Sequence, residues 1–284
     1  MKLTPTISLL FLALLFSGCM DTESPFGDPV DETDFLEQNA LEDDVTVTDS
    51  GLQYRIIEEG EGDSPNSESV VFVEYEGSTI SGETFMDSDG IDYFPISILN
   101  LEGLVEGIQL MTEGSRFEFF IPSELGYGDN PPTGGPLRPG SVLVFDMELD
   151  SFLQNPEEFL ADNRENEDIT ETESGLQYRV IEEGSDNSPA EEDEVTIRYT
   201  GTFTNGYVFD ETSDEDTVTF PVEGFIPGFS EALQLMGEGG TYEIFVPANL
   251  GYDAPGIQRP PSIPEGAILV FEIELDEIIS NEED

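Results

Sequence analysis

Histidine and cysteine, two residue types that enzymes often use for proton transfer and nucleophilic attack, are nearly absent from this sequence. It contains no histidine and one cysteine, Cys19. A Ser-His-Asp triad, a Cys-His pair and a histidine-based zinc site are therefore excluded. Chemistry by carboxylates and catalysis by a shaped pocket remain, and we expect neither a metal nor a cofactor.

A pocket could form at residues 225–236, "FIPGFSEALQLM", where an Ile-Pro-Gly turn and an aromatic precede a short apolar helix. Phe225, Ile226 and Phe229 are either ordinary core or the floor of a binding pocket. Asp210 directly follows the apolar "YVF", which distinguishes it from the other acids. Residues 99–111, "LNLEGLVEGIQLM", look like an altered copy of the same stretch.

The charge is extreme, with 64 acidic residues against 8 basic ones and a net charge of −56. Such a surface repels nucleic acid, because Lys and Arg provide affinity for phosphates, and it disfavours adsorption to anionic lipid. The acidity fits solubility through self-repulsion or a saline setting in which salt screens that repulsion. Calcium binding is a third alternative, although "DSDG" at 87–90 is too short for an EF-hand loop.

Residues 1–18 resemble a signal peptide, with Lys2 followed by an apolar run too short to span a membrane. "LFSGC" resembles a lipobox, so we expect Cys19 to become an acylated N-terminus that anchors the protein. The alternative is a secretory signal with an incidental cysteine. The acidic residues 19–34 are predicted to form a tether. Because Met20 rather than Asp follows the cysteine, resemblance to other lipoproteins implies the outer membrane.

The remainder of the chain contains an internal repeat. "SGLQYRIIEEG" and "SGLQYRVIEEG" lie 124 positions apart, and most later landmarks keep this offset to within two residues. A period this long indicates two homologous domains, each with its own core. We place them at 35–152 and 153–279, followed by an acidic tail at 280–284.

Each domain contains mostly short strands, rich in β-branched and aromatic residues. In the second domain we expect strands at 175–183, 194–201, 217–222, 241–247 and 267–278. One short helix, "GFSEALQLM" at 228–236, should pack its apolar residues, Leu235 among them, on the sheet. Another helix, around 155–163, should lead into the domain. This pattern predicts an α+β fold, with a curved antiparallel β-sheet wrapped over one short α-helix in each domain.

Five landmarks of the second domain occur in a fixed order: "IRYTG", "NGYVFD", "FIPGF", "LGYDAPG" and "IPEGAILVFEIEL". In this order they resemble the FKBP-type peptidyl-prolyl cis-trans isomerases, over residues 174–279. The first domain shows the series in weaker form, as "VEYEG", "SGETFMD", "NLEGL", "LGYGDNP" and "LRPGSVLVFDMEL". The resemblance implies two FKBP-like domains in tandem.

In the second domain the resemblance implies a pocket in which the substrate's proline ring rests on Phe229. It assigns Asp210 to the buried edge of this pocket, and it makes the Tyr252 hydroxyl and the Ile226 backbone N–H hydrogen-bond donors. The catalytic residues that it implies are Tyr199, Phe209, Asp210, Ile226, Phe229, Tyr252 and Phe271. The flanking substrate contacts that it implies are Phe220, Phe225 and Ile263. The family often has Trp in place of Phe229 and Gly in place of Asp253.

The first domain departs further from the family. The residues implied to contact substrate there are Tyr75, Phe85, Leu101, Leu104, Tyr127 and Phe145. Met86 occupies the place of the expected Asp, with Asp87 one position late, and Asn100 stands on the rim. We interpret this domain as a weakened isomerase or a binding module, and simple core packing explains Leu101 and Leu104 equally well.

The resemblance thus implies a lipid-anchored prolyl isomerase of the cell envelope that assists the folding of exported proteins, mainly through the second domain. Rotation about an X-Pro bond needs no nucleophile, only a pocket that binds the twisted amide better than the planar one. The implied partners are proline-containing unfolded or peptide substrates, the membrane through Cys19, and an FK506-like macrolide, but no nucleic acid. The alternatives are a non-catalytic peptide-binding or chaperone lipoprotein and, less favoured, a surface structural protein.

Overall fold

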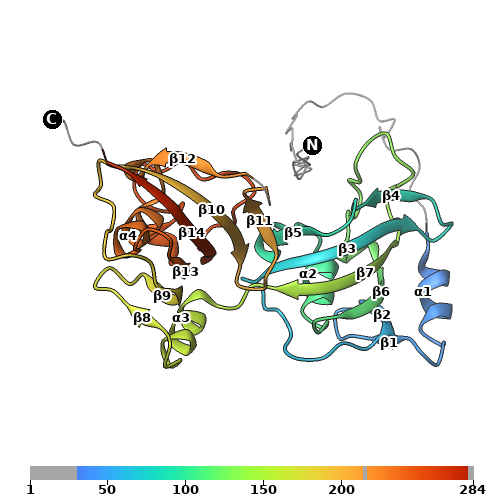
Figure 1. Cartoon of the computed structure of the whole chain (residues 1–284). Coiled ribbons are helices and arrows are strands. Elements are labelled where there is room, and N and C mark those ends of the chain that lie inside the picture. Colours follow the sequence, from blue (N-terminus) through green and yellow to red (C-terminus); the bar gives the residue numbers. More distant parts are fainter. Residues whose placement is uncertain (1–30, 214–215, 281–284) are drawn as a thin grey trace. The chain divides into compact units, whose positions relative to one another are not determined.

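The structure is a computed structural model that describes residues 31–213 and 216–280 (Figure 1). The expected signal peptide, the acylated Cys19, most of the tether and most of the tail lie outside the described residues. The chain divides into two compact units between Phe152 and Leu153. We call the described residues before this border domain 1 and those after it domain 2. Within the described ranges, no helix is long and apolar enough to cross a bilayer.

Domain 1 is a seven-stranded antiparallel sheet with two short α-helices. The strand order is β1-β2-β6-β7-β3-β4, and β5 also pairs with β3. The strands are β1 (Thr46–Val47), β2 (Gln53–Glu58), β3 (Val70–Thr79), β4 (Thr84–Asp87), β5 (Asp92–Pro95), β6 (Ser115–Ile121) and β7 (Leu143–Phe152). The helices are α1 (Thr33–Asn39) and α2 (Glu102–Ile108), with 3-10 turns η1 (Ile96–Ile98) and η2 (Ser123–Leu125).

Domain 2 repeats this topology. Its order is β11-β10-β14-β13-β9-β8, and β12 pairs with β10. The strands are β8 (Thr170–Glu171), β9 (Gln177–Glu182), β10 (Glu194–Phe203), β11 (Val208–Glu211), β12 (Val218–Pro221), β13 (Thr241–Val246) and β14 (Leu269–Ile279). The helices are α3 (Pro156–Arg164) and α4 (Pro227–Leu235), with 3-10 turns η3 (Val222–Gly224) and η4 (Ala248–Leu250).

The predicted α+β fold is confirmed in both domains, including the short helix on the sheet and the helix that leads in. Two strands of domain 2, β8 and β11, were not expected. They have two and four residues, too few for a period-2 pattern to stand out from the surrounding loops. One helical contact was also wrong, because Leu235 is 40% exposed and its side chain does not join the core. Leu233 and Met236 do, and both are fully buried.

The lead-in helices are fastened to their own sheets in the same way. Asn39 Nδ2 of α1 donates to Gln53 Oε1 of β2 at 2.9 Å, and Gln53 Nε2 donates to a carbonyl of α1 at 3.0 Å. Asn163 and Gln177 make the corresponding bonds in domain 2, each at 2.9 Å. Both glutamines are buried, where an unpaired amide would be costly. These two pairs of bonds form what we call the lead-in brace.

Candidate active site

The ring side chains of domain 2 that the sequence singled out form a cluster around Phe271 of β14. The ring centroids of Phe229, Phe209 and Tyr199 lie 5.1, 5.6 and 6.1 Å from that of Phe271. All three rings meet it edge to face, an arrangement that the aromatic quadrupole favours. The four rings come from α4, β11, β10 and β14, so the cluster forms only when helix and sheet are assembled.

The start of α4 provides the floor of this cluster. Pro227 occupies the first turn of the helix, where its missing N–H costs nothing. One residue before it, Ile226 is 9% exposed and extended, and no hydrogen bond joins its backbone N–H to another described residue. Phe229 is 2% exposed and stacks on Phe225 with a centroid distance of 4.6 Å. The turn therefore presents an aromatic face beside a free backbone donor.

A tyrosine and a carboxylate sit at the rim. The Tyr199 hydroxyl donates to Asp210 Oδ2 at 2.7 Å. Burial raises the pKa of Tyr199, and the hydrogen bond to Asp210 and its negative charge raise it further. Burial and the charge of Asp210 likewise raise the pKa of Tyr252. The Asp210 side chain is exposed, whereas the resemblance implied a carboxylate at the buried edge of the pocket.

A glycine in β10 allows two rings of the cluster to lie against the sheet. A Cβ on Gly201 would stand 2.9 Å from Phe209 Cζ and 2.9 Å from Phe271 Cε1, closer than carbon atoms pack. At the same point the pairing of β10 with β11 shifts register, which forms a bulge between Gly201 and Thr202. Such bulges re-aim side chains, and this one lies beside the pair Gly201 and Asp210.

The other residues assigned to the site take different positions. Ile263, on the loop before β14, is 5% exposed, whereas Phe220 of β12 is 51% exposed and reaches the cluster only through Phe225, at 5.9 Å. Asp253, which departs from the family's glycine, accepts hydrogen bonds from Gly266 N at 2.7 Å and from Arg259 at 3.2 Å. Asp253 thus ties together the loop that carries Tyr252 and Ile263.

Domain 1 keeps the part of this arrangement that the strands provide, which we call the sheet half. Phe85 and Phe145 meet edge to face at 5.6 Å, as their counterparts do. A Cβ on Gly77 would stand 2.9 Å from Phe85 and 3.0 Å from Phe145. Gly77 therefore corresponds to Gly201 and allows the rings of β4 and β7 to lie against the sheet. The corresponding bulge lies between Gly77 and Ser78.

The part that the start of the helix provides, which we call the helix half, differs because Leu101 and Leu104 replace Ile226 and Phe229. Both leucines are 4% exposed and belong to the core cluster of domain 1. Burial does not decide between floor and core, since Phe229 is no more exposed. Tyr127 packs at the edge of the same core, and burial raises its pKa.

The sequence pattern did not single out one polar residue of this region, Asp92. The Tyr75 hydroxyl donates to Asp92 Oδ2 at 3.3 Å. Asp92 begins β5, and one more acid in an acidic chain carried no signal. Its position becomes visible only through strand pairing, which places it opposite Val73, two residues from Tyr75.

These features suit a ligand that is apolar at its centre and polar at its edges. The rings supply apolar surface, and beside them lie a tyrosine hydroxyl, a carboxylate and a backbone N–H. No group of three or more metal-ligating side chains occurs among residues 31–213 and 216–280.

Comparison with known families gives the same answer for both domains. The family described as FKBP-type peptidyl-prolyl cis-trans isomerase matches residues 62–150 and 185–276. These segments cover more than half of the chain. The chain belongs to this FKBP family. The domain that precedes such isomerases matches residues 30–56 and 147–180, which contain α1 and α3.

Three relatives of the FKBP chain are each 43% identical to it over one stretch. They are the FKBP-type peptidyl-prolyl cis-trans isomerase FkpA of Aeromonas hydrophila (120 residues), the FKBP-type 22 kDa peptidyl-prolyl cis-trans isomerase of Escherichia coli (122 residues) and the outer membrane protein MIP of Legionella longbeachae (118 residues). The matches cover 42%, 43% and 41% of this chain and 44%, 58% and 50% of the relatives. The chain thus spans about half the length of these relatives.

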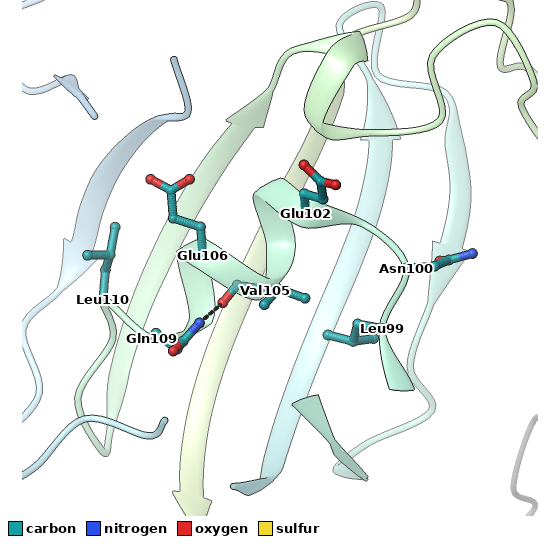
Figure 2. Close-up of a pocket in the computed structure, with 7 residues that line it drawn as sticks. All are labelled: Leu99, Asn100, Glu102, Val105, Glu106, Gln109 and Leu110. Carbon is teal, nitrogen blue, oxygen red and sulfur yellow. Dashed lines mark hydrogen bonds between the residues drawn. The ribbon is translucent and has the colours of Figure 1, made fainter. Parts of the chain in front are cut away.

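The FKBP domain 1 also has a hollow of about 590 Å³ beside α2 (Figure 2). Its lining holds none of the aromatic residues described above and consists of Leu99, Asn100, Glu102, Val105, Glu106, Gln109 and Leu110. Within this lining, Gln109 Nε2 donates to the Val105 carbonyl at 2.7 Å. At the places of Leu99 and Val105, domain 2 has Gly224 and Ser230, whereas Glu106, Gln109 and Leu110 correspond to Glu231, Gln234 and Leu235. The two domains thus share only part of this lining.

Proposed function

We propose that domain 2 is a peptidyl-prolyl cis-trans isomerase site and that the cluster around Phe271 is its catalytic pocket. The observation that carries the proposal is the convergence of four rings from α4, β10, β11 and β14 beside the Tyr199–Asp210 pair. Support comes from membership of the FKBP family and from relatives whose names state this activity.

Catalysis in such a pocket acts on the amide and not on a nucleophile. Resonance in the amide creates a rotational barrier of about 18–20 kcal/mol. In a dry site, the planar amide with its charge separation loses solvation, whereas the twisted amide has little charge separation to solvate. Phe229 and Phe271 hold the proline ring, and the Ile226 N–H and the Tyr252 hydroxyl donate to flanking carbonyls. The pocket therefore binds the twisted amide more tightly than the planar one.

Tyr199 and Asp210 have supporting roles in this proposal. The 2.7 Å bond fixes the Tyr199 hydroxyl at the rim. A tyrosine is already protonated at neutral pH, and the raised pKa of Tyr199 moves its ionisation to still higher pH. A neutral, oriented tyrosine then forms one wall without placing a charge next to the apolar floor. Phe209, Phe225, Phe220 and Ile263 complete the walls.

Domain 1 is proposed to bind peptides with little or no isomerase activity. Its leucine floor offers less flat surface to a proline ring than Phe229 does. A purely non-catalytic peptide-binding or chaperone role for the whole chain is the second candidate, favoured by the helix half of domain 1. An FK506-like macrolide, with a ring that can occupy the same apolar floor, is the proposed small-molecule ligand of domain 2.

The clients are proposed to be exported proteins with X-Pro bonds, encountered in the cell envelope. The proposed anchor is an acylated Cys19 after removal of residues 1–18. A relative named as an outer membrane protein supports the outer membrane as the location. Labelling cells with radioactive palmitate tests the anchor, and a Cys19→Ser variant that still incorporates label would contradict it.

The activity is tested by proline cis-trans exchange in a short peptide with the full chain. The Tyr199→Phe substitution removes one hydroxyl from domain 2, and Tyr75→Phe makes the matched change in domain 1. We expect Tyr199→Phe to lower kcat/KM about fivefold, the value of one hydrogen bond of about 1 kcal/mol. Tyr75→Phe should change it less than twofold. A wild-type chain that binds the peptide without accelerating exchange would support the non-catalytic alternative.

A further inference from the structure

The two domains differ in where their rim carboxylate comes from. In domain 2, Asp210 of β11 pairs with Gly201 of β10. The residue at the same register in domain 1 is Met86 of β4, which pairs with Gly77. Met86 packs against the apolar core cluster, so this position supplies no charge.

A second strand supplies the carboxylate in domain 1. Asp92 of β5 pairs with Val73 of β3, and its Oδ2 accepts a hydrogen bond from the Tyr75 hydroxyl. The corresponding pair in domain 2 is Val218 and Ile197, which leaves no acid at that register. Domain 1 therefore has no acid at the β4 register of Asp210, but it has an acid, Asp92, on β5.

Several groups surround the Tyr75 hydroxyl, and Asp92 dominates among the charged ones. The Tyr75 and Phe94 rings meet edge to face, with their centroids 6.5 Å apart. Burial raises the pKa of Tyr75 to about 12, with the charge of Asp92 next in size, then the hydrogen bond to it, and then Asp87 and Tyr127. Asp87, the nearest acid along β4, thus acts more weakly than Asp92.

We propose that domain 1 holds a second prolyl-peptide site, in which Asp92 is the positioning residue that orients Tyr75 in place of the absent β4 acid. The class of ligand rests on the function proposed for domain 2. The bond of 3.3 Å is longer than the 2.7 Å bond between Tyr199 and Asp210, so the tyrosine is held less firmly. Domain 1 therefore binds the peptide more weakly and does so above an aliphatic floor.

The test uses the full chain with ring-labelled tyrosine, observed by NMR during titration with a proline-containing tetrapeptide. Tyr75→Phe and Tyr199→Phe assign the two resonances. Asp92→Asn removes the charge but keeps the shape of the side chain. Asp89→Asn, an exposed acid nearby, is the matched control. Combining Met86→Asp with Asp92→Val moves the acid to the register that it has in domain 2.

We expect Asp92→Asn to lower the pKa of Tyr75 below about 12 and to weaken peptide binding at Tyr75 about fivefold. Asp89→Asn should change neither quantity. The double variant, if it folds, should restore binding to within twofold of wild type, which loss of a merely structural contact would not allow.

Three results would overturn the proposal: a wild-type chain whose Tyr75 resonance does not respond to peptide, an Asp92→Asn variant with unchanged pKa and affinity, and a folded double variant without restored binding. Failure of the function proposed for domain 2 is seen separately, as an absent response at Tyr199 or absent acceleration of proline exchange.

Discussion

The two FKBP domains agree in one half of their candidate sites and differ in the other. The strands place Phe85 against Phe145 and Phe209 against Phe271 at the same 5.6 Å. The starts of α2 and α4, in contrast, carry leucines in one domain and aromatics in the other. The sheet half includes a bulge and a glycine beside the two rings, and both domains have them. The helix half differs between the domains, and we expect this half to give each domain its own ligand preference.

The largest expected effect tests the shared half. Phe145→Ala and Phe271→Ala each empty a buried ring site, and we expect each to destabilise its own domain by about 3–5 kcal/mol. Denaturant unfolding, followed by domain-specific NMR signals, measures this loss. If one domain tolerated the change and the other did not, the two sheets would not be packed equivalently.

Substitution of Gly77 and Gly201 also tests the shared sheet half, with a smaller expected loss of stability. Because a Cβ at Gly77 or Gly201 approaches two rings within 3.0 Å, Gly77→Ala and Gly201→Ala should each destabilise by about 1–3 kcal/mol through overpacking. Only Gly201→Ala should also reduce isomerase activity, since it displaces Phe209 and Phe271. Equal activity losses in the two variants would place catalysis in both domains.

A swap of the floor tests the half that differs. Phe229→Leu gives domain 2 the residue that domain 1 has as Leu104, and we expect kcat/KM to fall about tenfold, equivalent to about 1.4 kcal/mol of transition-state binding. Leu104→Ile is the control, because it changes the shape of the other floor without touching domain 2. Full activity in Phe229→Leu would mean that Phe229 contributes to core packing and not to catalysis.

The rim carboxylate of domain 2 can be tested by charge removal. Asp210→Asn removes the negative charge that opposes ionisation of Tyr199, so the pKa of Tyr199 should fall, and kcat/KM should fall about threefold. A titration followed by tyrosine NMR and an activity assay at neutral pH measure the two changes. A rise in the pKa of Tyr199 would contradict the assigned contact.

The smallest expected effect concerns charged residues that pair across neighbouring strands within each sheet. In domain 2, Arg198 of β10 pairs across to Glu274 and bridges it at 3.1 Å, whereas domain 1 pairs Glu74 with Glu148. Glu74→Arg should therefore stabilise domain 1 by about 0.5 kcal/mol at low salt. Thermal unfolding measures the gain, which 1 M NaCl should abolish by screening. A gain that persists in salt would point to packing instead of charge.

The sequence predicted the parts that repeat and the parts with long patterns. The offset of 124 residues, the long strands and the helix before Met236 were all sufficient to predict the fold, and the fold was confirmed. The family resemblance brought Tyr199, Phe209, Phe229 and Phe271 together, and their geometry agrees with it, while their catalytic roles stay predictions. Asp92 could not be predicted, because its contact depends on the pairing of β3 with β5 and not on neighbours in sequence. Leu235 was misassigned because an apolar residue near a helix end can face either core or solvent.

The lead-in brace has a consequence for how this chain can be cut and recombined. Two of its four hydrogen bonds lie within domain 1 and two within domain 2. A splice between Phe152 and Leu153 therefore breaks none of them. The unit that these bonds hold together is therefore the sheet with its own lead-in helix, not the sheet alone. A chimera with two copies of domain 2, joined at this border, would carry a complete set of these fasteners in each copy, and so would an array of three.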